Sequence, residues 1–209
     1  MAKRNGILSR SDIPYAQRIK MKKHAMIVHE RETAAKAIMF CNARALHEIE
    51  GIGYKRLIKY ALHFKSLNDD FYEDPILEME HAKRRMEQMG MPISGELFTI
   101  QGKDKLDTEI KTHALQAAQV ALICAAVAMN DMFKLGKERQ ERVTQRANEL
   151  AGRYKEEGMQ FLLDYLEKIG FVVVDGEVRG YLDDDGNPIT ARKAKDYFAK
   201  DGVSNGGLL

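Results

Sequence analysis

A chain of 209 residues that is 44% apolar and 31% charged has the composition of a globular protein, which excludes wholesale disorder. Its two cysteines are too few for a disulfide scaffold, and the first 30 residues contain no apolar segment typical of a secretory signal. The longest apolar run, residues 120–129, is ten residues long, whereas a membrane-spanning helix needs about 20. These features predict a reducing, cytoplasmic location and no membrane partner.

The net charge of +2 is unevenly distributed along the chain. Residues 1–36 contain nine basic and three acidic residues, a balance of +6, which leaves about −4 for the rest. The sequence therefore predicts a basic N-terminal arm, residues 1–30, attached to a mildly acidic body.

The first half of the body contains three predicted helices. Residues 15–50 lack Gly and Pro, which predicts one long helix or two abutting ones, ended by Gly51 and Gly53. A second helix follows, and Asp74-Pro75 begins a third that Gly90 closes, with Asp as N-cap and Pro at the first position. A short hairpin is expected over residues 91–101. The apolar stripes of the second and third helices are Leu57, Tyr60, Phe64, Leu67 and Phe71, and then Met79, Ala82, Met86 and Met89.

The second half repeats this order. An apolar helix is predicted from Leu115 to Phe133, and a hairpin is predicted over residues 171–182 with Asp175-Gly176 at its turn. An acidic turn, residues 183–188, precedes a short helix from Thr190 to about residue 200 and a frayed tail. Two further helices are predicted between the apolar helix and the hairpin. Their apolar stripes are Val143, Ala147, Leu150 and Tyr154, and then Met159, Leu162, Leu166 and Ile169.

Nearly constant shifts relate the two halves. Adding 83 carries Cys41 to Cys124, Gly53 to Gly136 and Arg56 to Arg139, while shifts of 80 and 81 relate the third stripes and the Gly-Glu turns. We therefore predict a mainly α fold, a duplicated three-helix unit in which each copy is closed by a short β-hairpin, packed as an internal pseudo-dimer. The alternative is a plain helical bundle with coincidental spacing. The predicted organisation is the basic arm or helix at 1–30, unit 1 at 31–101, unit 2 at 102–182, and the C-terminal turn, short helix and flexible tail at 183–209.

No residues form a recognisable catalytic, cofactor or metal motif. Both cysteines lie among alanines and aliphatic residues and are expected to be core side chains. Glu78 and His81 have the Glu-x-x-His spacing of di-iron bundles, but the second half lacks the matching copy. The acidic turn fails the calcium-loop pattern, because Gly186 at position six would place Tyr181 at position one. Nucleotide-binding and serine-nucleophile motifs are also missing. We expect no enzymatic activity and no cofactor, although scattered residues can still converge in a fold.

Basic residues are the main candidates for a binding site. Lys and Arg on a helix or arm can neutralise phosphates, but a solvated helix face is the alternative interpretation. A second group begins the middle helix of each unit, as a helix-turn-helix module would present to DNA, with exposed ion pairing as the alternative. The arm candidates are Arg18, Lys20, Lys22 and Lys23; the turn candidates are Lys55, Arg56 and Lys59 in unit 1 and Lys137, Arg139 and Arg142 in unit 2.

The sequence Gly51-Ile-Gly-Tyr-Lys-Arg-Leu57 and its counterpart Leu135-Gly-Lys-Glu-Arg-Gln-Glu-Arg142 resemble the glycine turns of small helical proteins of phages and prophages of Gram-positive bacteria. The second copy departs from that pattern at Gln140, where Leu is expected. The resemblance covers about 40 residues per unit and implies no catalytic residues. It implies a phage accessory protein in the cytoplasm of a bacterial host, which binds a host or phage protein as a regulator, adaptor or inhibitor of a host defence system. A nucleic-acid-binding regulator is the second hypothesis, and homo-oligomerisation is left open.

Overall fold

The computed structural model describes residues 15–93, 99, 101–175, 177–182 and 186–190. This part of the chain forms helices with one small antiparallel sheet of strand order β1-β2-β3, which confirms the predicted mainly helical class. The helices are α1 (Tyr15–Glu50), α2 (Tyr54–Glu73), α3 (Pro75–Gln88), α4 (Lys105–Phe133), α5 (Lys137–Glu157) and α6 (Gln160–Lys168), and the strands are β1 (Phe171–Val174), β2 (Glu177–Leu182) and β3 (Pro188–Thr190).

The helix ends follow the predicted stop and start residues. Residues 15–50 form one continuous helix, and Gly51, at a φ of 64°, adopts the left-handed conformation that ends it. Gly53 and Gly136 are the N-caps of α2 and α5, and both have extended backbone geometry. The Asp74 carboxylate accepts a hydrogen bond from the backbone N–H of Leu77 at 3.2 Å, so it caps α3 as predicted.

Helix α4 begins ten residues earlier than predicted, at Lys105 instead of Leu115. Asp104 is its N-cap and accepts a hydrogen bond from the backbone N–H of Asp107 at 2.9 Å. The early turns carry alternating charged, polar and apolar residues and no clear apolar stripe, which is why periodicity alone did not detect them.

The second predicted hairpin is confirmed, because β1 pairs with β2 in antiparallel register. Strand β3 was not predicted. Thr190, expected to cap a helix, is the last residue of β3, which pairs with β2. Pro188 is the first residue of this edge strand, a position where the missing backbone N–H costs no ladder bond. The first predicted hairpin and the rest of the C-terminal helix fall largely or wholly outside the described residues.

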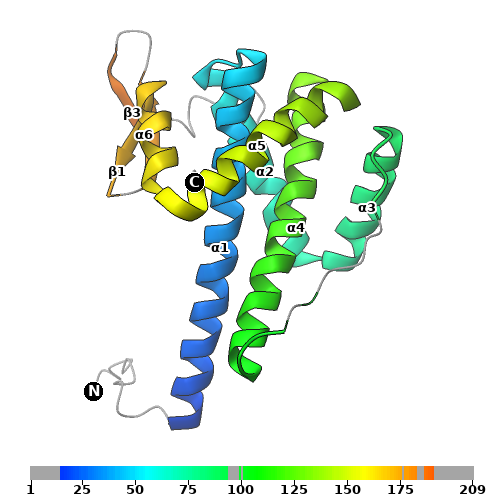
Figure 1. The fold of residues 1–209 in the computed structure, drawn as a ribbon, viewed down its shortest axis with the longest axis vertical. Coiled ribbons are helices and arrows are strands. Elements are labelled where there is room, and N and C mark those ends of the chain that lie inside the picture. The colour runs from blue at the N-terminus through cyan, green and yellow to red at the C-terminus, as the bar shows by residue number, and fades with distance from the viewer. Residues whose placement is uncertain (1–14, 94–98, 100, 176, 183–185, 191–209) are drawn as a thin grey trace, which may run out of the picture.

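Helices α1 and α4 lie side by side and run in the same direction, as Figure 1 shows. Contacts of α1 with α4 near the start of both helices agree with this direction, because Lys23 pairs with Glu109 and Arg31 hydrogen-bonds His113. Helix α2 packs on both, and α5 crosses α1. Helix α3 lies on the outer side of α4, while α6 and the sheet lie on the opposite side of the pair (Figure 1).

Small buried side chains line the centre of the α1–α4 pair. Alanines allow two helix backbones to approach closely, so the shared interface can be narrow. By length and mean hydropathy α4 could cross a membrane, but 56% of its most apolar stretch is buried inside the body. Its apolar character therefore has a packing explanation. The alanines of these two helices that belong to the main core are Ala35, Ala43 and Ala45 in α1 and Ala121, Ala125 and Ala128 in α4.

The predicted apolar stripes form the core around this pair. Tyr60 is fully buried in the stripe of α2, with its ring stacked near Phe133 at a centroid distance of 6.1 Å. Its hydroxyl group is buried and forms no hydrogen bond with a described residue. Burial also raises the pKa of the Tyr60 phenol, so the hydroxyl stays protonated. An unsatisfied buried hydroxyl is a local cost in an otherwise apolar core.

Replacing Tyr60 by Phe should therefore raise the free energy of unfolding, by ~1 kcal/mol, because the ring packing remains and the desolvated hydroxyl is removed. Urea denaturation followed by far-UV circular dichroism measures the change. Tyr154→Phe, at a partly exposed ring, is the control and should have little effect. A clear loss of stability in Tyr60→Phe would mean that the hydroxyl forms a hydrogen bond in solution.

Candidate binding surface

The basic residues of the α5 turn contact the end of α1. Arg139 donates a hydrogen bond from Nε to the Glu50 carboxylate at 2.9 Å, and the Arg142 guanidinium lies 3.5 Å from the same group. The hydrogen bond from Arg139 lowers the pKa of Glu50, so this carboxylate is charged. Lys137 lies 4.0 Å from Glu141 in the same helix. These three candidate cations are thus engaged within the molecule.

The basic residues of the α2 turn are engaged in a similar way. The Arg56 guanidinium lies over the ring of Phe133, the last residue of α4, at 5.0 Å from the ring centroid. Lys55 and Lys59 also interact with other residues of the chain. The repeated basic turns are therefore components of the contacts between α2 and α4 and between α5 and α1.

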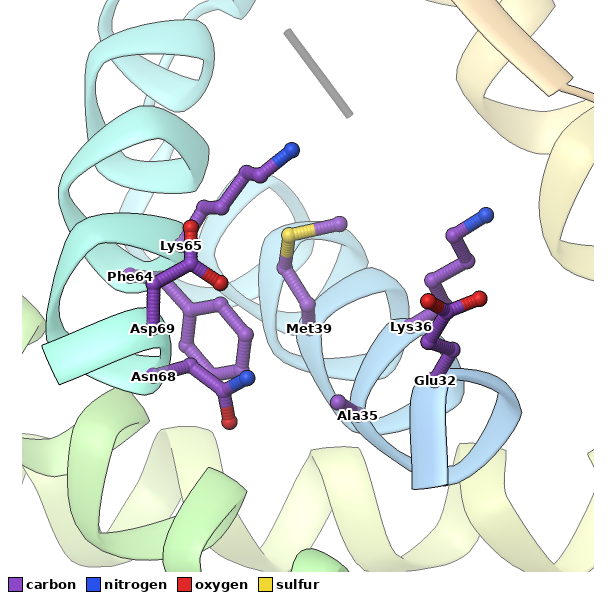
Figure 2. A pocket seen from close by; sticks show the side chains of 8 residues that line it. All are labelled: Glu32, Ala35, Lys36, Met39, Phe64, Lys65, Asn68 and Asp69. Carbon is purple, nitrogen blue, oxygen red and sulfur yellow. The ribbon is translucent and has the colours of Figure 1, made fainter. Parts of the chain in front are cut away.

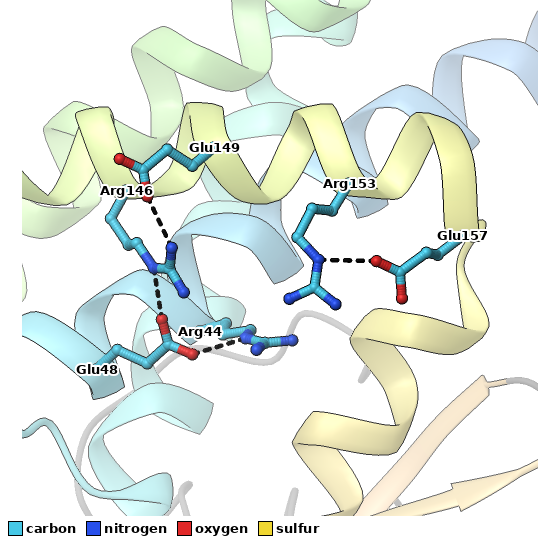
Figure 3. Close-up of polar contacts among 6 residues, drawn as sticks. All are labelled: Arg44, Glu48, Arg146, Glu149, Arg153 and Glu157. Atoms are coloured by element: carbon cyan, nitrogen blue, oxygen red, sulfur yellow. Dashed lines mark hydrogen bonds and ion pairs between the residues drawn. The ribbon is translucent and has the colours of Figure 1, made fainter.

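A second polar contact joins α5 to α1, around Glu48 (Figure 3). Arg146 of α5 donates to Glu48 at 2.7 Å, and Arg44 of α1 donates to the same carboxylate at 2.8 Å. Burial opposes ionisation of Glu48, but these hydrogen bonds and charges hold its pKa below the usual range. Arg44 also stacks on Phe161 and Tyr165 of α6, at 4.5 and 4.1 Å from the ring centroids.

The matching contact between α2 and α4 is centred on Asp131. His63 of α2 lies 2.7 Å from the Asp131 carboxylate, and Arg85 of α3 pairs with the same oxygen. Burial would raise the pKa of Asp131, but the hydrogen bonds from Arg85 and His63 outweigh it and lower the pKa. One half-buried carboxylate thus holds three helices together.

The arm candidates lie on the first turns of α1. Arg18, Lys20 and Lys22 are exposed and form no ion pair with a described residue, whereas Lys23 pairs with Glu109 of α4. Figure 1 shows that this part of α1 extends past the start of α4. Of the ten predicted site residues, these three are therefore exposed and not engaged in an ion pair or ring contact with a described residue.

Large apolar side chains are exposed over the half of the molecule that contains the starts of α1 and α4 and the α2–α3 corner, which sequence analysis did not predict. Ile76 is 82% exposed and Met21 55%. The sequence gives an indication for Leu77 alone, which is out of phase with the buried stripe, because Ile76 lies three residues before Met79 and so continues the spacing of that stripe. We name this surface the apolar end. Its seven members are Ile19, Met21 and Met26 of α1, Tyr72 of α2, Ile76 and Leu77 of α3, and Leu106 of α4; the other large apolar side chains found exposed in the described chain are Ile49, Leu122 and Val174.

A contact between helices places Tyr72, one member of the apolar end, beside the middle of α1. The Arg31 guanidinium of α1 lies over the Tyr72 ring of α2 at 5.2 Å and also hydrogen-bonds His113 of α4 at 2.9 Å. In Figure 1 the α2–α3 corner lies level with the middle of α1, farther along the molecule than the starts of α1 and α4. Exposed large apolar side chains that form a surface patch mark an interaction site.

A cavity of about 230 Å³ lies between α1 and α2 (Figure 2). Ala35, Met39 and Phe64 form its apolar lining, and the Oδ1 atom of Asn68 is buried without a hydrogen-bond partner among the described residues. The remaining lining residues, Glu32, Lys36, Lys65 and Asp69, contribute two charges of each sign. The lining contains no histidine, cysteine or serine, so it holds no Ser-His or Cys-His pair.

The cysteines have the surroundings of core residues. Both are buried, and burial raises the pKa of Cys41 to about 11 and that of Cys124 further. Thiols in this state are poor nucleophiles and poor metal ligands. Glu78 and His81 contact each other at 3.2 Å, and within the described chain no three His, Cys, Asp or Glu residues gather as metal ligands.

No protein-family model, curated protein or solved structure matches this chain. The geometry of the described residues is therefore the basis for assigning a function.

Three half-buried or paired carboxylates between helices predict an acid-sensitive fold. The pKa values of Glu48, Glu50 and Asp131 are lower in the folded chain than in the unfolded one, so their stabilisation is complete above the unfolded values, about 4.3 for Glu and 3.9 for Asp. It is lost as the pH falls through the lower folded values. The double variant Glu48→Gln with Asp131→Asn should be less stable at pH 7 and should lose less stability below about pH 5.

Thermal unfolding followed by circular dichroism across this pH range measures the effect. Glu80→Gln is the matched control, because Glu80 also has a lowered pKa but pairs only with Lys83 of its own helix and is exposed. If the double variant loses thermal stability with falling pH as steeply as the wild type does, Glu48 and Asp131 are not the cause of the acid sensitivity.

Proposed function

We propose that this chain is a non-enzymatic accessory protein, of the phage type that its glycine turns resemble, and that it acts by binding another protein through the apolar end. The observation that carries this proposal is that seven large apolar side chains, each at least 40% exposed, lie on the first half of α1, at the α2–α3 corner and at the start of α4. Leaving such groups in water is unfavourable, and burying them against a partner recovers that free energy. A regulator, an adaptor and an inhibitor of a host system all fit this mode of action.

We also propose that the body is a fused pseudo-dimer of two copies of one unit. In a two-fold arrangement, each contact from copy one to copy two has a reciprocal contact from copy two to copy one. The shift of 83 converts His63 to Arg146 and Glu48 to Asp131. The pair His63–Asp131 and the pair Arg146–Glu48 are therefore reciprocal contacts, each between a middle helix and the first helix of the other half.

A second reciprocal set supports the same proposal. The shift of 83 converts Arg56 to Arg139 and Glu50 to Phe133. Arg56 stacks on Phe133, and Arg139 bonds to Glu50, so equivalent arginines contact equivalent positions by different chemistry. Two amphipathic helices can match in sequence by chance, but a coincidence of sequence does not account for reciprocal tertiary contacts. A duplicated scaffold of this kind presents surface without a catalytic centre.

Nucleic-acid binding is the second candidate, and one observation favours it. Residues 15–29 contain four Lys or Arg residues and no Asp or Glu, and Arg18, Lys20 and Lys22 are exposed. Such a helix can neutralise phosphates. The basic turns add less to this candidate, because Arg139 and Arg142 face Glu50.

Charging the apolar end should abolish partner binding. The variant Ile76→Asp with Leu77→Asp replaces two exposed side chains, so the fold should be retained while the apolar contact is lost. The measurement is affinity capture from a bacterial lysate with quantitative mass spectrometry. Leu122→Asp is the matched control, because Leu122 is 45% exposed but lies on α4 away from the apolar end.

The wild type and Leu122→Asp should retain the same protein, and the double variant should lose it. Fluorescence anisotropy with DNA and RNA across a salt series tests the second candidate. Steeply salt-dependent binding that is lost in Arg18→Glu with Lys20→Glu and Lys22→Glu, together with equal protein capture by all variants, would replace the first proposal by the second.

A further inference from the structure

We propose that the cavity between α1 and α2 binds a small zwitterion with an apolar side chain, which is the chemistry of a free apolar amino acid. No residue that lines this cavity belongs to the apolar end, so the inference goes beyond the proposed protein binding. Three features of the lining carry it: an apolar floor, a rim with two charges of each sign, and an amide group whose oxygen has no partner.

The floor of the cavity is apolar and suits a small group. Ala35 and Met39 lie on the α1 wall, and Phe64 lies on the α2 wall (Figure 2). The cavity volume of about 230 Å³ is below the roughly 300–1,000 Å³ of pockets for drug-sized ligands. The Phe64 ring and the Met39 thioether are favourable neighbours for an aliphatic or aromatic group. The floor therefore fits one apolar side chain of amino-acid size.

Charged side chains of both signs form the rim. Glu32 and Lys36 of α1 face Lys65 and Asp69 of α2, so each wall carries one anion and one cation (Figure 2). The i,i+4 spacing allows an ion pair within each helix, but none of the four forms an ion pair with a described residue. A rim of this kind is complementary to a ligand that carries one ammonium and one carboxylate group.

An amide on the α2 wall adds a hydrogen-bonding group. Asn68 lines the cavity, and its Oδ1 atom is buried without a hydrogen-bond partner among the described residues. A buried oxygen in this state is unfavourable. Because a half-turn of the amide exchanges its oxygen and nitrogen, Asn68 can accept from an ammonium group or donate to a carboxylate. Either contact would give the amide a partner that the described chain does not supply.

The second half of the chain lacks this polar set. The shift of 83 carries none of the four charges, nor the Asn68 amide, to an equivalent group. Under the proposed duplication, packing of a first helix beside its middle helix therefore does not require these polar residues, whereas ligand recognition accounts for them. The shift converts Glu32 to Leu115, Lys36 to Gln119, Lys65 to Asn148, Asn68 to Ala151 and Asp69 to Gly152.

Isothermal titration calorimetry of the full chain with five probes tests the proposal. L-phenylalanine and L-leucine carry both charges and an apolar side chain. Phenethylamine lacks the carboxylate, 3-phenylpropionate lacks the ammonium group, and glycine lacks the side chain. We expect saturable binding of L-phenylalanine or L-leucine with a Kd on the order of 0.1–1 mM. The three incomplete probes should bind at least ~10-fold more weakly, because each leaves part of the site without a partner.

Two double variants separate the two charge contacts. Glu32→Gln with Asp69→Asn removes the partners of the ammonium group, and Lys36→Gln with Lys65→Gln removes those of the carboxylate. Each should bind the amino acid at least ~10-fold more weakly and should keep the far-UV circular dichroism spectrum of the wild type. The matched control, Glu167→Gln with Lys168→Gln, changes exposed charges on α6, which does not line the cavity, and should bind like the wild type.

Nuclear magnetic resonance locates the bound probe. The backbone amide signals that shift on titration should belong mainly to residues 32–39 and 64–69. Absence of saturable binding of both amino acids up to ~10 mM, or unchanged binding by both double variants, would overturn the inference. Equal binding of phenethylamine or 3-phenylpropionate would also overturn it, because one charge would then suffice, and so would signal shifts confined to other parts of the chain.

Discussion

The close packing of α1 against α4 is the constraint on which the rest of the structure depends. Small buried side chains on both helices, such as Ala45 and Ala121, allow the parallel backbones to lie side by side. Helix α2 then packs over α4 as well as α1, and α5 packs over α1. Helix α1 of the first half is therefore covered in part by α5 of the second half, and α4 of the second half is covered in part by α2 of the first half.

Ion pairs and hydrogen bonds form at the edge of the core where α5 crosses α1 and where α2 packs on α4. The Glu48 and Asp131 side chains are 21% and 26% exposed, and each is held ionised by a basic group from the opposite half, with Arg44 of α1 also bonded to Glu48. Removing the partner from the opposite half would remove part of that stabilisation of the charged form. These contacts therefore fix the orientation of the middle helices, while the apolar stripes supply most of the driving force.

Sequence periodicity predicted the helical class, the stripes of α2, α3 and α5 and most of the helix boundaries, because Gly51, Asp74 and Gly136 have local conformational effects that do not depend on the fold. The first turns of α4 were missed, because residues there have no single apolar face. Strand β3 was missed because it forms by pairing with β2, a contact between segments that local propensity does not encode.

The candidate site was predicted in part for the same reason. Basic residues can be identified from sequence, but their partners depend on the fold, so the contact of Arg139 with Glu50 across 89 positions was not foreseeable. The apolar end was missed because its members come from four helices and are not adjacent in sequence. Ile76 illustrates the limit: its spacing of three from Met79 predicts a place on the buried stripe, but at the first turn of α3 the fold leaves it 82% exposed.

The most direct test of the mutual covering of the two halves is to split the chain between residues 98 and 99 and to express the two fragments separately. Circular dichroism and thermal unfolding of each fragment and of an equimolar mixture give the answer. We expect each fragment alone to lack a cooperative transition, and we expect the mixture to recover the helicity and the single transition of the intact chain. A fragment that unfolds cooperatively on its own with its full helical content, or a mixture that adds nothing to the separate spectra, would contradict it.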